Sequence, residues 1–127
     1  LFMDDDVKTS LFLAIEKDNV EIVKLLLSNP SIDVNKGYGN KAPLLLAIEK
    51  DNVEIVKLLL SNPSINVNQE SETVVEYQFK MTRIETTALF LTIYQQKIET
   101  LKILIQQKGI VISNSEKQYI NQLGVSI

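Results

Sequence analysis

The side chains that could do chemistry in this sequence are limited to carboxylates, Lys, Tyr, Ser and Thr. The 127 residues include no cysteine and no histidine, which excludes a thiol nucleophile, a Cys/His zinc site and a Ser-His-Asp triad. Three consecutive aspartates, Asp4, Asp5 and Asp6, could bind a hard cation such as Ca²⁺ or Mg²⁺. The flanking residues lack the EF-hand spacing, so we favour a solvated acidic loop.

Two carboxylates and four glycines are the other candidates for a site. Glu16 and Glu49 hold the same position in successive copies of a repeated segment, and we expect them about 10 Å apart. That separation could suit a catalytic pair, but no pocket or acid/base tuning is indicated. The glycines form neither a dinucleotide-binding fingerprint nor a P-loop. We therefore expect no catalysis, no cofactor and no metal.

Charge and hydropathy argue against two classes of binding partner, nucleic acids and membranes. Thirteen basic and 16 acidic side chains give a net charge of −3, whereas nucleic-acid binders usually carry a basic patch. No apolar run approaches the roughly 18 residues of a membrane span, and no signal-peptide pattern opens the sequence. We expect a protein that binds no nucleic acid, inserts into no membrane and lies inside the cell, in the cytoplasm.

A duplicated segment governs the expected fold. Residues 14–32 read AIEKDNVEIVKLLLSNPSI, and residues 47–65 repeat them letter for letter at an offset of 33. A diverged third copy begins at Thr87, at an offset of 45, so 12 extra residues separate it from the second copy. The last residues, 123–127, match the apolar positions at the start of the first copy, which predicts the opening of a fourth unit.

Each copy contains two short helical patterns. Thr9 is the expected N-cap of the first helix, and Asp18 with Asn19 suits the turn between the helices. Pro30 should end the second helix near Ser28. Helices of about eight to ten residues are marginal alone in water, so the units must stack on one another.

The repeat motifs resemble those of ankyrin repeats. The unit starts read TSLFLA at 9–14, APLLLA at 42–47 and TALFLT at 87–92; the second helices read IVKLLL at 22–27 and 55–60; the turns read DVN at 33–35 and NVN at 66–68. The resemblance covers residues 4 to about 112, apart from the insertion. The family's histidine is replaced by Phe12, Leu45 and Phe90, which removes its usual hydrogen bond to the connecting loop.

The resemblance implies an all-α repeat solenoid of stacked helix-turn-helix units with hairpin fingers, one of them lengthened. We expect one domain over residues 1–127, with repeat 1 at about 4–36, repeat 2 at about 37–69, an insertion at about 70–85, repeat 3 at about 86–113, and a partial cap or truncated repeat 4 at 114–127.

The resemblance also implies a non-catalytic scaffold that binds a partner protein through its concave face. That face is formed by the fingers and the exposed ends of the first helices. The candidate contacts there are Asp5, Asp6, Lys8, Glu16, Lys17, Tyr38, Asn40, Lys41, Glu49, Lys50, Tyr94 and Gln95. Tyr38 and Tyr94 are the preferred anchors because aromatic residues dominate binding hot spots; the alternative is that both are ordinary surface tyrosines. The Glu-Lys pairs are more typical of a solvated face.

The insertion is the most individual segment. Val75, Tyr77, Phe79 and Met81 alternate with polar residues, which predicts a β-hairpin with one apolar face, although no Gly, Pro or Asn marks its turn. That face either packs on the second and third copies or presents Tyr77, Phe79 and Met81 to a partner.

The ends of the array suggest an alternative role. The first copy shows no polar substitution along its outer face, although terminal repeats usually need one. We expect a piece of a longer array, or self-association through the hairpin or the uncapped ends, with residues 114–127 as a makeshift cap. The alternative to a scaffold is a structural spacer or a regulatory segment of a larger multi-repeat protein.

Overall fold

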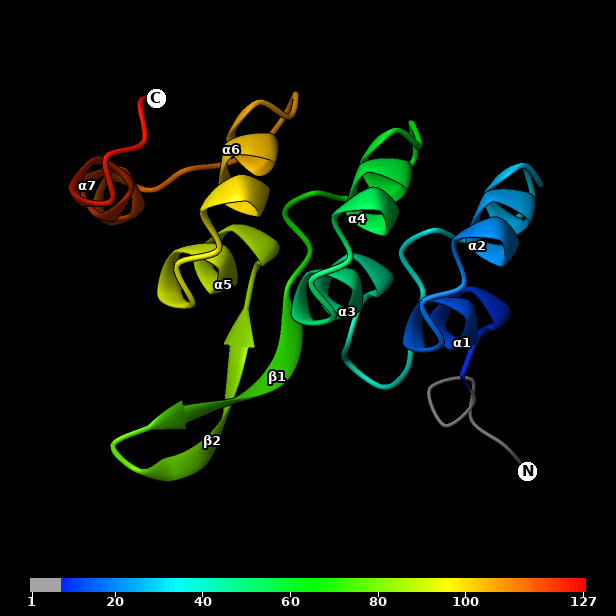
Figure 1. Ribbon diagram of the computed structural model, residues 1–127, viewed down its shortest axis with the longest axis horizontal. Coiled ribbons are helices and arrows are strands. Elements are labelled where there is room, and N and C mark those ends of the chain that lie inside the picture. The colour runs from blue at the N-terminus through cyan, green and yellow to red at the C-terminus, as the bar shows by residue number, and fades with distance from the viewer. Residues whose placement is uncertain (1–7) are drawn as a thin grey trace.

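The computed structural model describes residues 8–127, and two candidate contact residues, Asp5 and Asp6, lie outside that range. Within it, helical hairpins stand side by side in two rows, and a two-stranded hairpin extends from the row of first helices (Figure 1). The first helices are α1 (Ser10–Glu16), α3 (Pro43–Glu49) and α5 (Ala88–Tyr94), and the second helices are α2 (Val20–Leu27), α4 (Val53–Leu60) and α6 (Ile98–Ile105). Strands β1 (Ser71–Tyr77) and β2 (Lys80–Thr86) follow α4, and α7 (Asn114–Gln122) ends the stack. The helix-turn-helix solenoid is confirmed.

The unit boundaries follow from local chemistry. The Thr9 hydroxyl accepts a hydrogen bond from the Phe12 amide at 3.1 Å, which caps α1 as expected. The turn between the two helices places Asp18, Asp51 and Gln96 in the left-handed region, with φ between 52° and 55°. A left-handed residue reverses the chain in a short turn, so each second helix folds back against its first.

Identical sequences have different burial in the first two units. Ile55 of α4 is fully buried, whereas Ile22, its counterpart in α2, is 45% exposed. Leu25 is 70% exposed, while Leu58 is partly buried. The second unit lies between two neighbours, but within the described residues no helix covers the outer side of α2 (Figure 1). Stacking, rather than local sequence, therefore determines burial.

Asparagine side chains join the turns of neighbouring units. Asn35, after α2, donates a hydrogen bond through Nδ2 to the Ser64 carbonyl and accepts one at Oδ1 from the Asn66 amide, both at 2.8 Å. One amide group thus satisfies a donor and an acceptor of the next turn, which fixes the spacing between the two units.

Asn68 makes the same two contacts one unit further on, and its loss should weaken the stack. It donates to the Gly109 carbonyl and accepts from the Val111 amide, both at 2.8 Å. We expect Asn68→Ala to lower the free energy of unfolding by about 1–2 kcal/mol, because two hydrogen bonds are lost at a site that water can reach. Urea unfolding followed by circular dichroism measures this change. An unchanged midpoint would show that the turn is held by other contacts.

The last helix docks on the third unit without a finger before it. Ser113 caps α7 in a reciprocal capping box with Glu116, and α7 packs on α5. The caps of α1 and α3 are 33 residues apart, whereas those of α5 and α7 are 26 apart. The residues expected to open a fourth unit instead follow α7, where Gly124 has a φ of 79° and Val125 is buried. That interpretation of residues 123–127 is wrong, because an earlier amphipathic segment already occupies the next first-helix position.

Candidate interaction surface

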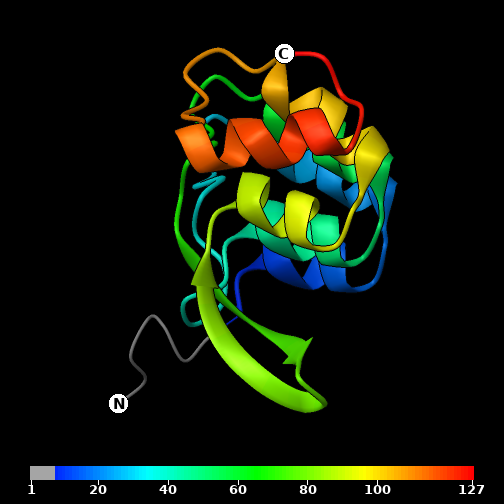
Figure 2. The same ribbon diagram turned by 90° about the vertical axis from the view of Figure 1, so that its left-hand side faces the viewer.

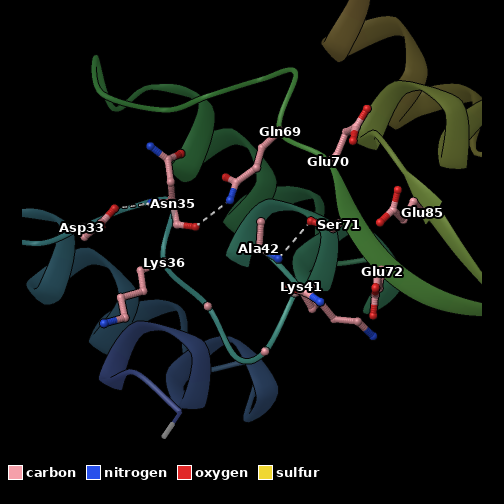
Figure 3. Close-up of a pocket in the computed structure, with 13 residues that line it drawn as sticks. Asp33, Asn35, Lys36, Lys41, Ala42, Gln69, Glu70, Ser71, Glu72 and Glu85 are labelled. Atoms are coloured by element: carbon pink, nitrogen blue, oxygen red, sulfur yellow. Dashed lines mark hydrogen bonds between the residues drawn. The ribbon is translucent and has the colours of Figure 1, made fainter. Parts of the chain in front are cut away.

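The finger between the first two units is a tight turn. The Tyr38 amide donates to the Lys41 carbonyl at 3.2 Å, and the Lys41 amide donates to the Tyr38 carbonyl at 3.0 Å. A Cβ at Gly37 would overlap the carbonyl oxygen of Lys41, so only glycine fits there. The finger is also bonded to the base of the hairpin, since the Ala42 amide donates to the Ser71 hydroxyl at 3.0 Å (Figure 3).

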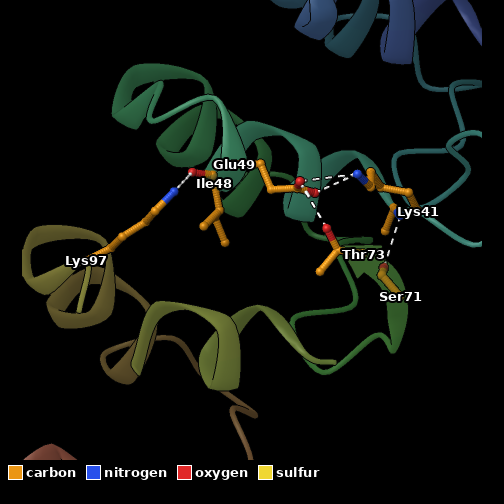
Figure 4. A network of polar contacts seen from close by, with 7 residues as sticks. Lys41, Ile48, Glu49, Ser71, Thr73 and Lys97 are labelled. Atoms are coloured by element: carbon orange, nitrogen blue, oxygen red, sulfur yellow. Dashed lines mark hydrogen bonds and ion pairs between the residues drawn. The ribbon is translucent and has the colours of Figure 1, made fainter. Parts of the chain in front are cut away.

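In the first two units, a lysine before the first helix pairs with a glutamate at the end of that helix. Lys8 lies 2.9 Å from Glu16, and Lys41 lies 2.8 Å from Glu49. Glu49 also accepts a hydrogen bond from the Thr73 hydroxyl of β1 at 3.0 Å (Figure 4). Its buried Oε1 has no aligned hydrogen bond within the described chain, and the Lys41 ammonium beside it compensates its charge. Each glutamate therefore has a lysine counterion, which gives no support for a catalytic carboxylate pair.

A second row of ion pairs crosses from unit to unit at the helix turns. Lys50 lies 3.3 Å from Asp18 of the preceding unit, and Lys97 lies 2.9 Å from Asp51. Lys97 also donates to the Ile48 carbonyl at 2.7 Å, where it caps the end of α3 (Figure 4). Lys50 is therefore exposed and also paired with Asp18 of the preceding unit. Lys17, Asn40 and Gln95 are exposed as well.

The two preferred tyrosines have different surroundings. Tyr38 lies over Phe12, with ring centroids 5.9 Å apart, and the Lys8 ammonium is 5.3 Å from the Tyr38 ring. Tyr94 donates its hydroxyl proton to the Glu76 carbonyl of β1 at 3.0 Å, so it supports the hairpin. Both rings remain 41% exposed. Tyr38 therefore presents an aromatic edge to solvent, whereas Tyr94 also holds a neighbouring element in place.

The inserted segment forms an antiparallel hairpin, but its apolar residues do not share one face. Val75 pairs with Thr82, and Glu76 pairs with Met81. Residues directly opposite each other point to the same face, so Met81 lies on the face opposite to Val75 and Tyr77. The expectation of a single apolar face is wrong, because the chain reverses through a two-residue turn. Val75 is buried against the array, whereas Tyr77 and Met81 are exposed.

The turn at the hairpin tip has an unusual backbone. Gln78 and Phe79 have φ values of 49° and 64°, a conformation that hairpins normally assign to Asn-Gly. Because neither residue is Gly, Pro or Asn, the turn could not be recognised in the sequence. The Phe79 side chain is 98% exposed, the most exposed large apolar side chain among the described residues. The hairpin tip therefore combines a strained backbone with an aromatic ring that is exposed to solvent.

Two open hollows lie on the surface beside the finger, the first mainly polar and the second partly apolar. One, of about 550 Å³, lies between the finger and the hairpin base, with Asp33, Lys36, Glu70 and Glu85 among its lining residues (Figure 3). A second, of about 450 Å³, lies between Tyr38 and the outer face of the hairpin, where Val74 and Arg83 line it. Over residues 8–127 no group of acidic side chains is arranged to hold a metal ion, and no helix is long and apolar enough to cross a bilayer.

A family model described as ankyrin repeats, in three copies, matches residues 2–71, which is more than half of the chain. The chain belongs to the ankyrin repeat family. No curated protein matches it significantly. The matched region ends at the base of β1, so α5 and α6, which pack on α3 and α4 as a further helical hairpin, lie beyond it.

Membership of the ankyrin repeat family indicates a broad class of function. Ankyrin repeats generally mediate protein–protein interaction and are typically non-catalytic. In this ankyrin chain, Phe79 at the tip of the hairpin and Tyr38 of the finger are among the exposed aromatic residues. The hairpin extends away from the helices (Figure 2). Sequence reasoning singled out both Tyr38 and Phe79, but it missed the strained backbone at the tip, which no residue pattern signals.

Proposed function

We propose that this ankyrin repeat chain is a non-catalytic scaffold inside the cell that binds a partner protein through its hairpin and concave face. The observation that carries the proposal is Phe79, which is 98% exposed on a left-handed backbone. A phenylalanine there costs conformational energy and gains no packing against residues 8–127, so its benefit should come from a contact outside this part of the chain.

We also propose that the hairpin is a lengthened finger. It lies between the second and third units, as residues 37–41 lie between the first and second. Its base bonds to that shorter finger, since the Glu72 amide donates to the Asn40 carbonyl at 2.8 Å. The length of the strands carries the turn between β1 and β2 well beyond the helices (Figure 1). A partner could therefore contact the tip and the concave face at once.

The proposed contacts on the concave face form two groups. Tyr38, Asn40 and Lys17 are exposed and open to a partner, together with Tyr77 and Met81 on opposite faces of the hairpin. The charged residues Lys8, Glu16, Lys41 and Glu49 are paired internally and would serve mainly to orient the finger segments. Aromatic anchors should therefore carry more of the binding energy than the charges do.

Affinity capture with three immobilised baits tests this proposal. The baits are the unchanged chain, Phe79→Ser and Leu25→Ser, where Leu25 is an apolar residue of α2 that is 70% exposed. We expect proteins that the unchanged chain and Leu25→Ser retain equally, and that Phe79→Ser retains about 30-fold less, as for a hot-spot residue. Equal recovery on all three baits would refute a binding role for the tip.

A further inference from the structure

The first two units show how a following finger affects the exposure of one position in each first helix. In the first unit, Phe12 is buried at 3% exposure, and Tyr38 of the following finger covers it. In the second unit, Leu45 occupies the same position at 2% exposure, with the hairpin base as its following finger. A following finger thus accompanies burial of this position in both units.

The third unit lacks that finger. Phe90 occupies the position of Phe12, but α7 begins directly after the turn, and Phe90 is 41% exposed. An apolar groove of about 490 Å³ lies there, between α5 and α7, with Phe90, Val111 and Tyr119 in its lining. Val111 is 69% and Tyr119 is 53% exposed, so the groove is open to a partner.

We propose that this groove binds the hairpin tip of a second copy of the chain. The groove is vacant where a finger with an aromatic residue would lie, and the hairpin is an elongated finger whose terminal aromatic, Phe79, has no cover. The charges agree as well. Lys80 follows Phe79 at the exposed tip, and Glu116, whose carboxylate also accepts a hydrogen bond from the Ser113 amide, lines the groove.

The tip of the same chain lies away from this groove. The hairpin passes under the end of α5, where Tyr94 bonds to Glu76, whereas the groove lies at the start of α5, near Thr87. In the view along the stack, the tip and the first turn of α7 lie on opposite sides (Figure 2). The contact therefore joins two molecules. It can be made reciprocally in a two-fold dimer, or repeat head to tail in a ring or an open chain.

This inference deepens the proposed function, because it names a second copy as one partner of the tip. Sedimentation velocity of the purified chain over a concentration series tests it. We expect the unchanged chain and the control Leu25→Ser to gain mass with concentration. Phe79→Ser, which lacks the tip, and Val111→Asp, which places a charge in the groove, should each stay monomeric, with association weakened about 30-fold or more.

Mixing the two variants separates a tip-to-groove contact from any other. Phe79→Ser keeps an intact groove and Val111→Asp keeps an intact tip, so together they should form a one-to-one complex that grows no further. An unchanged chain that stays monomeric at every concentration, or a mixture without that complex, would overturn the inference. Loss of partners from the Phe79→Ser bait would still support the proposed function in either case. Circular dichroism of each variant confirms that the helices are retained.

Discussion

Ile55→Ala should lower the free energy of unfolding by about 3 kcal/mol or more, whereas Ile22→Ala should cost about 1 kcal/mol or less. The two isoleucines lie in identical stretches of 19 residues, so their helix propensity and capping are the same. They differ in that Ile55 is fully buried, while Ile22 is 45% exposed on the outer side of the first unit. Truncating Ile55 leaves a cavity between stacked units, and truncating Ile22 removes only partly covered surface.

Urea unfolding of the two variants and the unchanged chain, followed by circular dichroism, gives the comparison. The matched pair Val56→Ala and Val23→Ala is the control, because both valines are buried inside their own units and should cost similar amounts. Equal losses at Ile22 and Ile55 would mean that something covers the outer face of the first unit in solution. In that case the losses should converge as protein concentration rises if the cover is another molecule.

Much of the helical architecture could be predicted from the sequence, because the repeat makes each element appear more than once. The cap at Thr9, the left-handed turn at Asp18 and the end of α2 near Ser28 all follow from local chemistry and are all present. These features depend on residues within a few positions of one another, which is the range over which sequence patterns act.

Features that depend on contacts between distant parts of the chain could not be predicted as well from the sequence. The alternation in the insertion predicts two strands, but the face of Met81 depends on the position of the turn, which Gln78 and Phe79 do not signal. Tyr94 looks like a surface aromatic, and its bond to Glu76 depends on the path of the hairpin. The last residues resemble the start of a unit, yet α7 occupies that place because its apolar side includes the fully buried Ile120.

The strained tip gives a prediction in which stability and binding change in opposite directions. Replacing Gln78 and Phe79 together with Asn-Gly supplies the sequence that a two-residue turn with two positive φ values favours. Relief of the left-handed strain at two positions should stabilise the hairpin by about 1–2 kcal/mol. The protection of the β1 and β2 amides against hydrogen exchange should rise correspondingly, by about 5- to 30-fold.

Binding should fall in the same variant, because the exposed ring of Phe79 is gone. Phe79→Ser is the matched control: it also removes the ring but keeps a side chain at positive φ, so it should lose binding without gaining amide protection. If the Asn-Gly variant retains partners and self-association, the tip is not a contact surface. If amide protection does not rise, the left-handed backbone at the tip does not destabilise the hairpin. The proposal that a binding role offsets the strain at Phe79 would then fail. The expected combination, a firmer hairpin that no longer binds, would mean that the chain gives up local stability to present one aromatic side chain.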